Sequence, residues 1–301
     1  MNVVTIFFQV VLPVFLIFGA GFLLQRASML DIRSISNLAI YILTPCLVFR
    51  TFYTSPLNMD YLFMVIFSLV LMTVLISITK LYAKIRKLSV QDESGMILST
   101  AFMNVGNYGT PIILFAYGQT AFDLAITFMV FQSIIMNIFG VYYAARGKAS
   151  MTFAVKAIFK MPATYATVVA LGLNVFSIPF PQPFFSTIDL VAEAAIPVVM
   201  LILGMQLAMI EWKAFDWEKI SVGVCIRMIF SPLLAYGITL FLPIDELLRN
   251  VLVVAAAMPS AATIVMYAVR FDAKPKLVST ITLVTTLVSL VSITFIIWIL
   301  S

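Results

Sequence analysis

Ten apolar segments, each about 20 residues long, follow one another along this chain with only short polar connections between them. A helix that crosses the hydrocarbon core of a bilayer needs about 20 apolar residues. The segments are apolar all round and lack the alternation of a β-barrel strand, and open sheet cannot satisfy its backbone in lipid. The sequence therefore predicts an all-α membrane protein with ten transmembrane helices. The segments lie at residues 3–24, 34–53, 60–82, 95–117, 121–144, 161–178, 187–209, 218–241, 247–269 and 277–300.

The composition excludes several functional classes. Hydrophobic residues make up 63% of the chain and charged residues only 10%, far from the balance of a soluble domain. There is no histidine, and Cys46 and Cys225 stand alone within apolar segments, so we expect no metal and no cofactor. The methionines are expected to face lipid or to pack between helices. The net charge of +5 is assigned to loops at the membrane surface rather than to nucleic-acid binding.

The basic residues predict the orientation of the chain in the membrane. Loops on the cytoplasmic side of a membrane protein carry an excess of Lys and Arg. If the N-terminus is outside, the inner loops hold 15 of the 18 basic residues, and the outer loops hold only Arg50 and Arg249. We therefore predict a multi-pass protein of the cell membrane with both termini outside. The inner basic residues are Arg26, Arg33, Lys80, Lys84, Arg86, Lys87, Arg146, Lys148, Lys156, Lys160, Lys213, Lys219, Arg270, Lys274 and Lys276.

The order of segments predicts an internal repeat. Pro45 in the second segment and Pro197 in the seventh are 152 residues apart, and the fourth and ninth segments, at about the same offset, both contain helix breakers. Five helices per half place the second half in the opposite orientation, which is an inverted repeat of the kind found in secondary transporters. We place the two halves at residues 1–145 and 146–301.

The fourth segment carries the densest cluster of helix breakers. Asn104, Gly106, Asn107, Gly109 and Pro111 lie within eight residues. Glycine costs about 1 kcal/mol and proline about 3 kcal/mol in a helix interior, so this helix should unwind here. Unwound backbone at membrane depth is tolerated only against protein or a wet cavity.

The ninth segment contains a second break at Pro259 and Ser260, among small residues. At a rise of 1.5 Å per residue, Asn104 and Pro259 both lie near the middle of a bilayer core about 30 Å thick. Two broken helices in matching places of two repeats are typical of a transporter site. The half-helices that follow would point their partly positive N-termini at an anionic group. The alternative is a pair of proline kinks without a ligand.

Three further polar residues lie inside apolar segments. Gln132 lies near the same depth, where it is a candidate ligand for a carboxylate or an interhelical structural hydrogen bond. Glu193 and Arg227 are ionisable, and such residues within a membrane indicate function by default. Glu193 is a candidate carrier of a coupling proton or cation, and Arg227 a candidate attractor of an anion. For each of these two residues, the alternative is that its side chain extends to the nearer membrane surface.

Together these residues resemble the auxin efflux carrier family, which includes plant PIN exporters and bacterial malonate and malate carriers. The stretch from Asn104 to Pro111 is similar to the N-x-x-x-x-G-x-P crossover of that family, and the stretch from Pro259 to Thr280 is similar to its helix 9–10 region. The resemblance implies ten helices in two inverted repeats with crossed broken helices 4 and 9. It also implies an elevator-like motion, usually in a homodimer, with helices 1, 2, 6 and 7 as scaffold and helices 3–5 and 8–10 as the transporting part. It makes Asn104 a carboxylate contact and Gln132 part of the adjoining site.

The leading hypothesis is a secondary transporter of a small organic anion, a mono- or dicarboxylate, coupled to H+ or Na+ and surrounded by lipid. The proposed binding residues are Asn104, Gly106, Asn107, Gly109 and Gln132. The alternative is a sodium-coupled symporter of the related bile-acid type. The third segment lacks the acidic residue that plant members carry there, so an auxin substrate is not implied. An enzyme is not expected, because the chain has no His and no Asp at the predicted depth.

Overall fold

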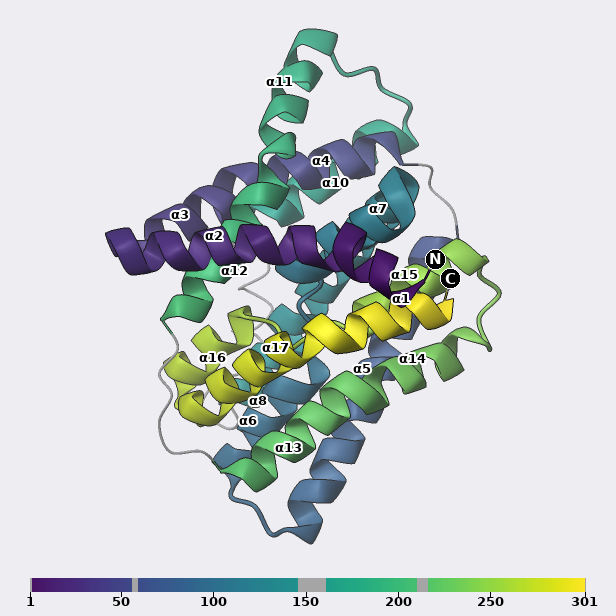
Figure 1. Cartoon of the computed structure of the whole chain (residues 1–301). Helices are drawn as coiled ribbons and strands as arrows, with labels where there is room; N and C mark the ends of the chain where they lie inside the picture. The colour runs from purple at the N-terminus through teal and green to yellow at the C-terminus, as the bar shows by residue number, and fades with distance from the viewer. Residues whose placement is uncertain (1, 56–58, 146–160, 210–215, 301) are drawn as a thin grey trace.

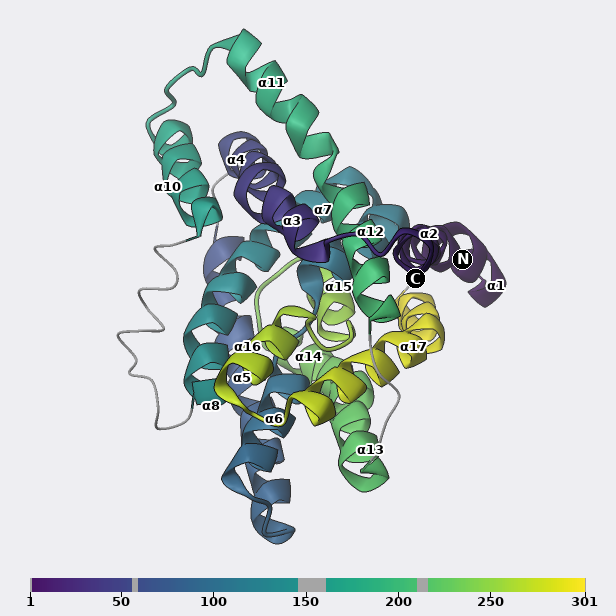
Figure 2. The same ribbon diagram turned by 90° about the vertical axis from the view of Figure 1, so that its left-hand side faces the viewer.

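The computed structural model describes residues 2–55, 59–145, 161–209 and 216–300, and its regular structure within these ranges is helical apart from one isolated bridge. Figures 1 and 2 show the helices in two views at right angles. Seven of the described helical segments are long and apolar enough to cross a membrane. The prediction of a helical membrane protein is therefore confirmed.

Several of the long helices contain a π-helical turn, labelled η. In such a turn the backbone hydrogen bond spans five residues instead of the four of an α-helix, and these turns occur often at functional sites. In the first half of the chain the elements are α1 (Val3–Ile6), η1 (Phe7–Val11), α2 (Leu12–Ser28), α3 (Ile32–Leu38), η2 (Ala39–Leu43), α4 (Thr44–Thr54), α5 (Asp60–Ile85), α6 (Val90–Ala101), η3 (Val105–Gly109), α7 (Thr110–Ile135), η4 (Met136–Gly140) and α8 (Val141–Ala145).

The second half contains the remaining elements. Its longest is α17, which ends one residue before the C-terminus of the chain. The elements are α10 (Pro162–Val175), α11 (Gln182–Glu193), α12 (Ala195–Ala208), α13 (Trp217–Cys225), η5 (Ile226–Phe230), α14 (Ser231–Thr239), α15 (Glu246–Ala256), α16 (Thr263–Phe271) and α17 (Pro275–Leu300).

Two helices are interrupted close to the predicted places. The first break covers residues 102–104, at the start of the predicted cluster, whereas residues 106–111, where unwinding was expected, are helical in η3 and α7. The second helix ends at Ala256 and resumes at Thr263, around the predicted Pro259. Within α7 the backbone turns at Gly118, whose φ of +81° is a conformation that glycine adopts without steric cost. This turn lies where the sequence predicts the connection between the fourth and fifth segments.

Some predictions fall at the edge of the described residues or beyond it. The predicted boundary between the halves, at residues 145 and 146, adjoins a range that the structure does not describe. Five of the basic residues counted for the inner loops also lie outside the described residues. They are Arg146, Lys148, Lys156, Lys160 and Lys213.

Helices α2 and α12 cross in direct backbone contact (Figures 1 and 2). A Cβ added to Gly21 would lie 2.2 Å from the carbonyl oxygen of Leu201, and one added to Gly204 would lie 1.9 Å from that of Phe18. Small residues at a helix contact let two backbones approach closely, and many membrane helices associate in this way. These two glycines therefore allow the contact between α2 and α12.

Helix α4 is held to α10 and α11 by polar contacts. The Asn174 side chain donates to the carbonyl groups of Phe52 and Ser55, at 2.8 Å in each case, where α4 ends. Arg50 of α4 forms an ion pair of 2.9 Å with Asp189 of α11. Because the last carbonyls of a helix have no intrahelical partner, Asn174 acts as a cap supplied by another helix. In Figure 1, α2, α4, α10, α11 and α12 occupy the upper part of the molecule.

The lower part of Figure 1 contains α5, α6, α13, α14, α16 and α17. The Thr79 hydroxyl of α5 lies 2.8 Å from that of Thr100 in α6. At the far end of the same helix pair, Asp92 of α6 forms an ion pair of 3.2 Å with Lys219 of α13. Polar contacts thus connect these helices at both ends of α6.

We predict that Gly21→Ala lowers the thermal stability of the purified protein, because the new methyl group would collide with the backbone of α12. Gly19→Ala, two residues earlier in the same helix, is the matched control, since its Cβ would meet no atom within 4 Å. Alanine is also the better helix former, so Gly19→Ala should leave the unfolding temperature unchanged or raise it slightly. Equal unfolding temperatures for the two variants would contradict the close contact.

Candidate functional site

The two interruptions meet and pair through their backbones. The amide of Asn104 donates to the carbonyl of Pro259 at 2.8 Å, and the amide of Ala261 donates to the carbonyl of Phe102 at 3.0 Å. This is a short antiparallel bridge between Met103 and Ser260. Backbone groups released by breaking a helix need partners in an apolar medium. Each break therefore supplies partners for the other.

Ser260 adds a side-chain bond to the same pairing. Its hydroxyl donates to the carbonyl of Ser99 at 2.6 Å, and its amide donates to the hydroxyl of Thr285 at 3.2 Å. Ser99 belongs to the last turn of α6, whose carbonyls have no N–H donor within the helix. The residue after Pro259 thus helps to cap the first broken helix and to attach it to α17.

Arg227 lies at the ends of both broken helices and is 0% exposed. Its Nη1 donates to the carbonyl of Thr100 at 3.0 Å, and its Nη2 donates to the carbonyl of Ala256 and to the hydroxyl of Ser231. Thr100 and Ala256 are in the last turns of α6 and α15. A positive charge is favourable at the partly negative C-terminus of a helix, and here one guanidinium serves two of them. The side chain therefore points into the protein and does not extend to the membrane surface.

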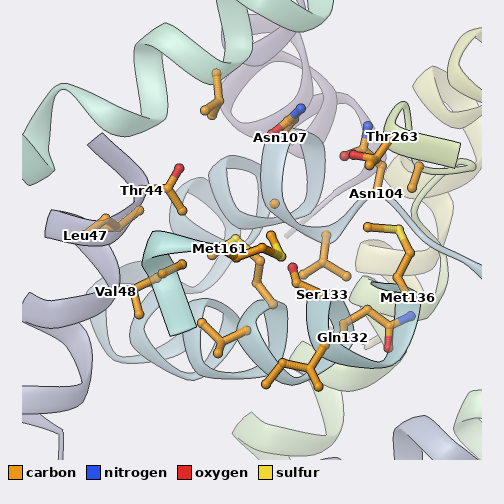
Figure 3. A pocket seen from close by; sticks show the side chains of 18 of the residues that line it. Thr44, Leu47, Val48, Asn104, Asn107, Gln132, Ser133, Met136, Met161 and Thr263 are labelled. Carbon is orange, nitrogen blue, oxygen red and sulfur yellow. The ribbon is translucent and has the colours of Figure 1, made fainter. Parts of the chain in front are cut away.

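A cavity of about 150 Å³ adjoins the first interruption (Figure 3). One part of its wall comes from the residues around the first break, from α7, from η4 and from the start of α16. The other part comes from α4, from α10 with the preceding Met161, and from α12. The described residues lining it are Thr44, Leu47, Val48, Met103, Asn104, Val105, Gly106, Asn107, Met129, Val130, Gln132, Ser133, Ile134, Met136, Met161, Ala163, Thr164, Ala195, Ile196, Val199, Ala261 and Thr263.

Asn104 and Gln132 bring unpartnered amide groups to this cavity. The two residues are only 5% and 3% exposed, yet Nδ2 of Asn104 and both polar atoms of the Gln132 amide have no hydrogen-bond partner among the described residues. A buried polar group without a partner costs about 1–3 kcal/mol. Native proteins rarely retain such groups unless a ligand or water completes them. The two amides therefore provide N–H donors for a guest in the cavity.

Two helix N-termini also reach the cavity. The turn η3 begins at Val105, and its closing bond runs from the amide of Gly109 to the carbonyl of Asn104 at 3.0 Å. The amides of residues 105–108 therefore have no acceptor within the helix. Helix α16 begins at Thr263, which also lines the cavity. Helix N-termini carry a partial positive charge and favour anions.

The other predicted residues occupy different positions around this centre. Gly106 and Asn107 line the cavity, whereas Gly109 and Pro111 do not. Gly109 closes the first turn, and a Cβ there would lie 3.1 Å from Cγ of Met258. Pro111 is the second residue of α7, which continues directly from η3; its ring nitrogen cannot donate to the preceding turn, where the Thr110 hydroxyl donates to the carbonyl of Gly106 at 2.6 Å. Both positions shape the break rather than contact the cavity.

Glu193 and Arg227 are not among the lining residues. Glu193 is the last residue of α11 and is exposed on the surface of the described chain. Arg227 is buried at the C-termini of α6 and α15. The structure therefore does not bring these two ionisable residues together with Asn104 and Gln132.

Most of the apolar wall was not predicted from the sequence. Four methionines line the cavity, although the methionines were expected to face lipid or to pack between helices. Met129 and Met136 lie three residues before and four residues after Gln132, so they share its face of the helix. This spacing was a signal for two of the four. Met103 and Met161 come from other segments, and the sequence contains no comparable signal for them.

A cavity with unpartnered amides beside broken helices, inside a helical membrane protein, is typical of a membrane transporter. Residues 6–297 of the chain match the family described as membrane transport protein. The chain therefore belongs to this family, to which the auxin efflux carriers also belong, and it is a multi-pass membrane transporter and not an enzyme.

Three relatives illustrate the family. A protein of Methanothermobacter thermautotrophicus named "Uncharacterized transporter" is 26% identical over 295 residues, which is 95% of each chain. A Rhizobium meliloti protein named "Putative malonate transporter" is 23% identical over 272 residues, or 86% of this chain and 84% of the relative. "Auxin efflux carrier component 6" of Arabidopsis thaliana is 26% identical over 148 residues, or 46% of this chain and 25% of the relative.

We predict that Arg227→Leu lowers the unfolding temperature of the purified protein strongly, because it leaves the carbonyls of Thr100 and Ala256 without this donor. A buried carbonyl left without any donor costs about 1–3 kcal/mol, and in this variant only Ala256 keeps a second donor, the Ser231 hydroxyl at 2.8 Å. Ser231→Ala removes that bond and the one that the Ser231 hydroxyl accepts from Arg227, but it leaves Arg227 on both carbonyls, so it should have a smaller effect. Arg227→Lys keeps the charge but lacks the planar fork of donors, so it should fall between wild type and Arg227→Leu. A fully stable Arg227→Leu would contradict this role.

Proposed function

We propose that the protein is a secondary transporter that moves a small organic anion, a mono- or dicarboxylate, across the cytoplasmic membrane. The observation that carries the proposal is the pair of buried amides, Asn104 and Gln132, with unpartnered N–H donors at a cavity. Two helix N-termini add positive potential there. In this proposal Gly106 and Asn107 line the carboxylate site, and the bridge at Pro259 keeps the break open. The name of the Rhizobium meliloti relative agrees with an anionic substrate.

The two sides of the cavity suggest how the anion moves. The amide ligands come from the first interruption and α7, whereas the facing wall of α4, α10 and α12 consists mainly of small and apolar side chains such as Leu47, Val48 and Val199. A ligand held by one group of helices can slide past such a wall without breaking polar bonds. We therefore propose an elevator-like motion of the helices around the two breaks against α2, α4, α10 and α12. Two inverted five-helix repeats, a homodimer and outward termini remain predictions of this proposal.

The ion that drives transport is part of the same proposal. No acidic side chain is among the described lining residues, and Glu193 lies outside the cavity. Glu193 was the main acid proposed for a sodium-coupled symporter. We propose coupling to H+ or Na+, and the imposed gradients in the flux measurement identify which ion drives uptake.

We predict that the protein reconstituted in liposomes takes up radiolabelled small carboxylates, and that Asn104→Ala abolishes uptake because it removes a donor from the cavity. Asn250→Ala is the matched control, since Asn250 is a buried amide in α15 that does not line the cavity. Its uptake should be near that of wild type. Imposed pH and sodium gradients in separate vesicles identify the coupling ion.

Two results would contradict the proposal. One is the absence of carboxylate flux above that of empty liposomes. The other is undiminished flux in an Asn104→Ala variant, whose unfolding temperature and elution profile should match those of wild type. Uptake that follows only a sodium gradient would instead support the symporter of the bile-acid type.

A further inference from the structure

The described residues give the cavity polar groups but no charged side chain. Every described residue in its wall is neutral, and the walls include four methionines together with Leu47, Val48 and Val199. What this part of the wall offers to the charge of a ligand is therefore a set of dipoles. This restriction separates the two kinds of substrate that the proposed function leaves open.

The available dipoles match one negative charge. A helix N-terminus is equivalent to about half an elementary charge, so η3 with α7 and α16 together supply about one. Asn104 and Gln132 add N–H donors at the same end of the cavity. One carboxylate can be satisfied in this way. A second carboxylate on the same molecule would lie against apolar walls, and burial of an uncompensated charge is strongly unfavourable.

The lining residues are also arranged unevenly. In Figure 3, Asn104, Gln132 and Thr263 lie on one side of the cavity, and Leu47, Val48 and Thr44 lie on the opposite side. Met161 lies between these sides and Met136 lies beside Asn104 and Gln132, and the flexible thioethers of methionine adapt to apolar guests of different shape. The cavity thus has an amide end and a largely apolar end, which fits a molecule with one polar head.

The volume limits the size of the guest. An apolar cavity of about 150 Å³ engineered into another protein binds benzene, a molecule of six heavy atoms. The cavity here has about the same volume. Carboxylates with a short alkyl chain, such as butyrate and pentanoate, have about this size. Malonate has it as well, so size alone does not distinguish the two kinds of acid.

We propose that the cavity selects a singly charged, short-chain monocarboxylate over a dicarboxylate of equal size. The carboxylate binds Asn104 and Gln132, and the alkyl chain extends toward Leu47 and Val48. This inference rests on the proposed function, because it assigns the substrate class of the same site. It also distinguishes this chain from what the name of its Rhizobium meliloti relative states.

The test measures the binding of radiolabelled butyrate, pentanoate and malonate to the purified protein, at a pH at which both malonate carboxyls are ionised. We expect the two monocarboxylates to bind at least tenfold more tightly than malonate. Acidification that protonates one malonate carboxyl should narrow the difference in affinity between malonate and the monocarboxylates, because malonate then carries a single charge. Octanoate, with its longer chain, should compete weakly.

A substitution at the apolar end adds an independent measurement. Leu47→Lys places a cation where the second carboxylate of malonate would lie, and we expect it to shift selectivity toward malonate by tenfold or more. Leu30→Lys introduces the same cation at an exposed position that does not line the cavity, so it should retain the wild-type preference, which makes it the matched control. If Leu47→Lys does not fold, the comparison of acids on the wild-type protein still decides the question.

The outcomes separate this inference from the proposed function. Malonate that binds as tightly as pentanoate, or more tightly, would overturn the inference and leave an organic-anion transporter in place. No binding or flux of any of these carboxylates would overturn both. Preference for the monocarboxylates, lost in Asn104→Ala and retained in Asn250→Ala, is the result that supports both.

Discussion

The antiparallel backbone pairing between the two interrupted helices is the interaction on which the rest of the site depends. A helix broken inside a membrane exposes amides and carbonyls that lipid cannot satisfy. Here the amide of Asn104 donates to the carbonyl of Pro259, and the amide of Ala261 donates to the carbonyl of Phe102. Neither break would be tolerable alone, because each supplies half of the other's partners. The pairing also fixes which residues face the cavity, since it sets the register of the two segments.

Each break creates a helix C-terminus with a partial negative charge and a helix N-terminus with a partial positive charge. The C-terminal ends of α6 and α15 meet the guanidinium of Arg227, while the N-termini of η3 and α16 face the cavity. Each end thus has a partner of suitable sign within the protein or in a guest. These helix ends give the cavity a positive potential, and no basic side chain is among the described residues of its wall. A site that holds an anion by dipoles can also release it, since no full ion pair with such a residue has to be broken.

Much of this arrangement followed from the sequence. Local composition predicted the apolar helices and both interruptions, because glycine and proline act within a few residues of their own position. Asn104 and Gln132 were identified because an amide is conspicuous in an apolar segment. The placement of Arg227 and Glu193 was not predictable in this way. Whether a charged residue turns inward or outward depends on helix rotation and on partners more than a hundred residues away, which periodicity does not record. Most of the methionine wall was missed for the same reason.

Arg227 has an electrical consequence for a moving transporter. Its guanidinium is bonded to α6 and α15, so its charge would travel with these helices in any motion that carries them across the membrane. A singly charged guest would offset this charge, whereas in the empty carrier the charge would be uncompensated. A full membrane potential of 100 mV acts on one charge with about 2.3 kcal/mol. Binding of the guest, and of a cotransported cation, would therefore change the charge on which voltage acts, which current recordings from reconstituted protein can detect.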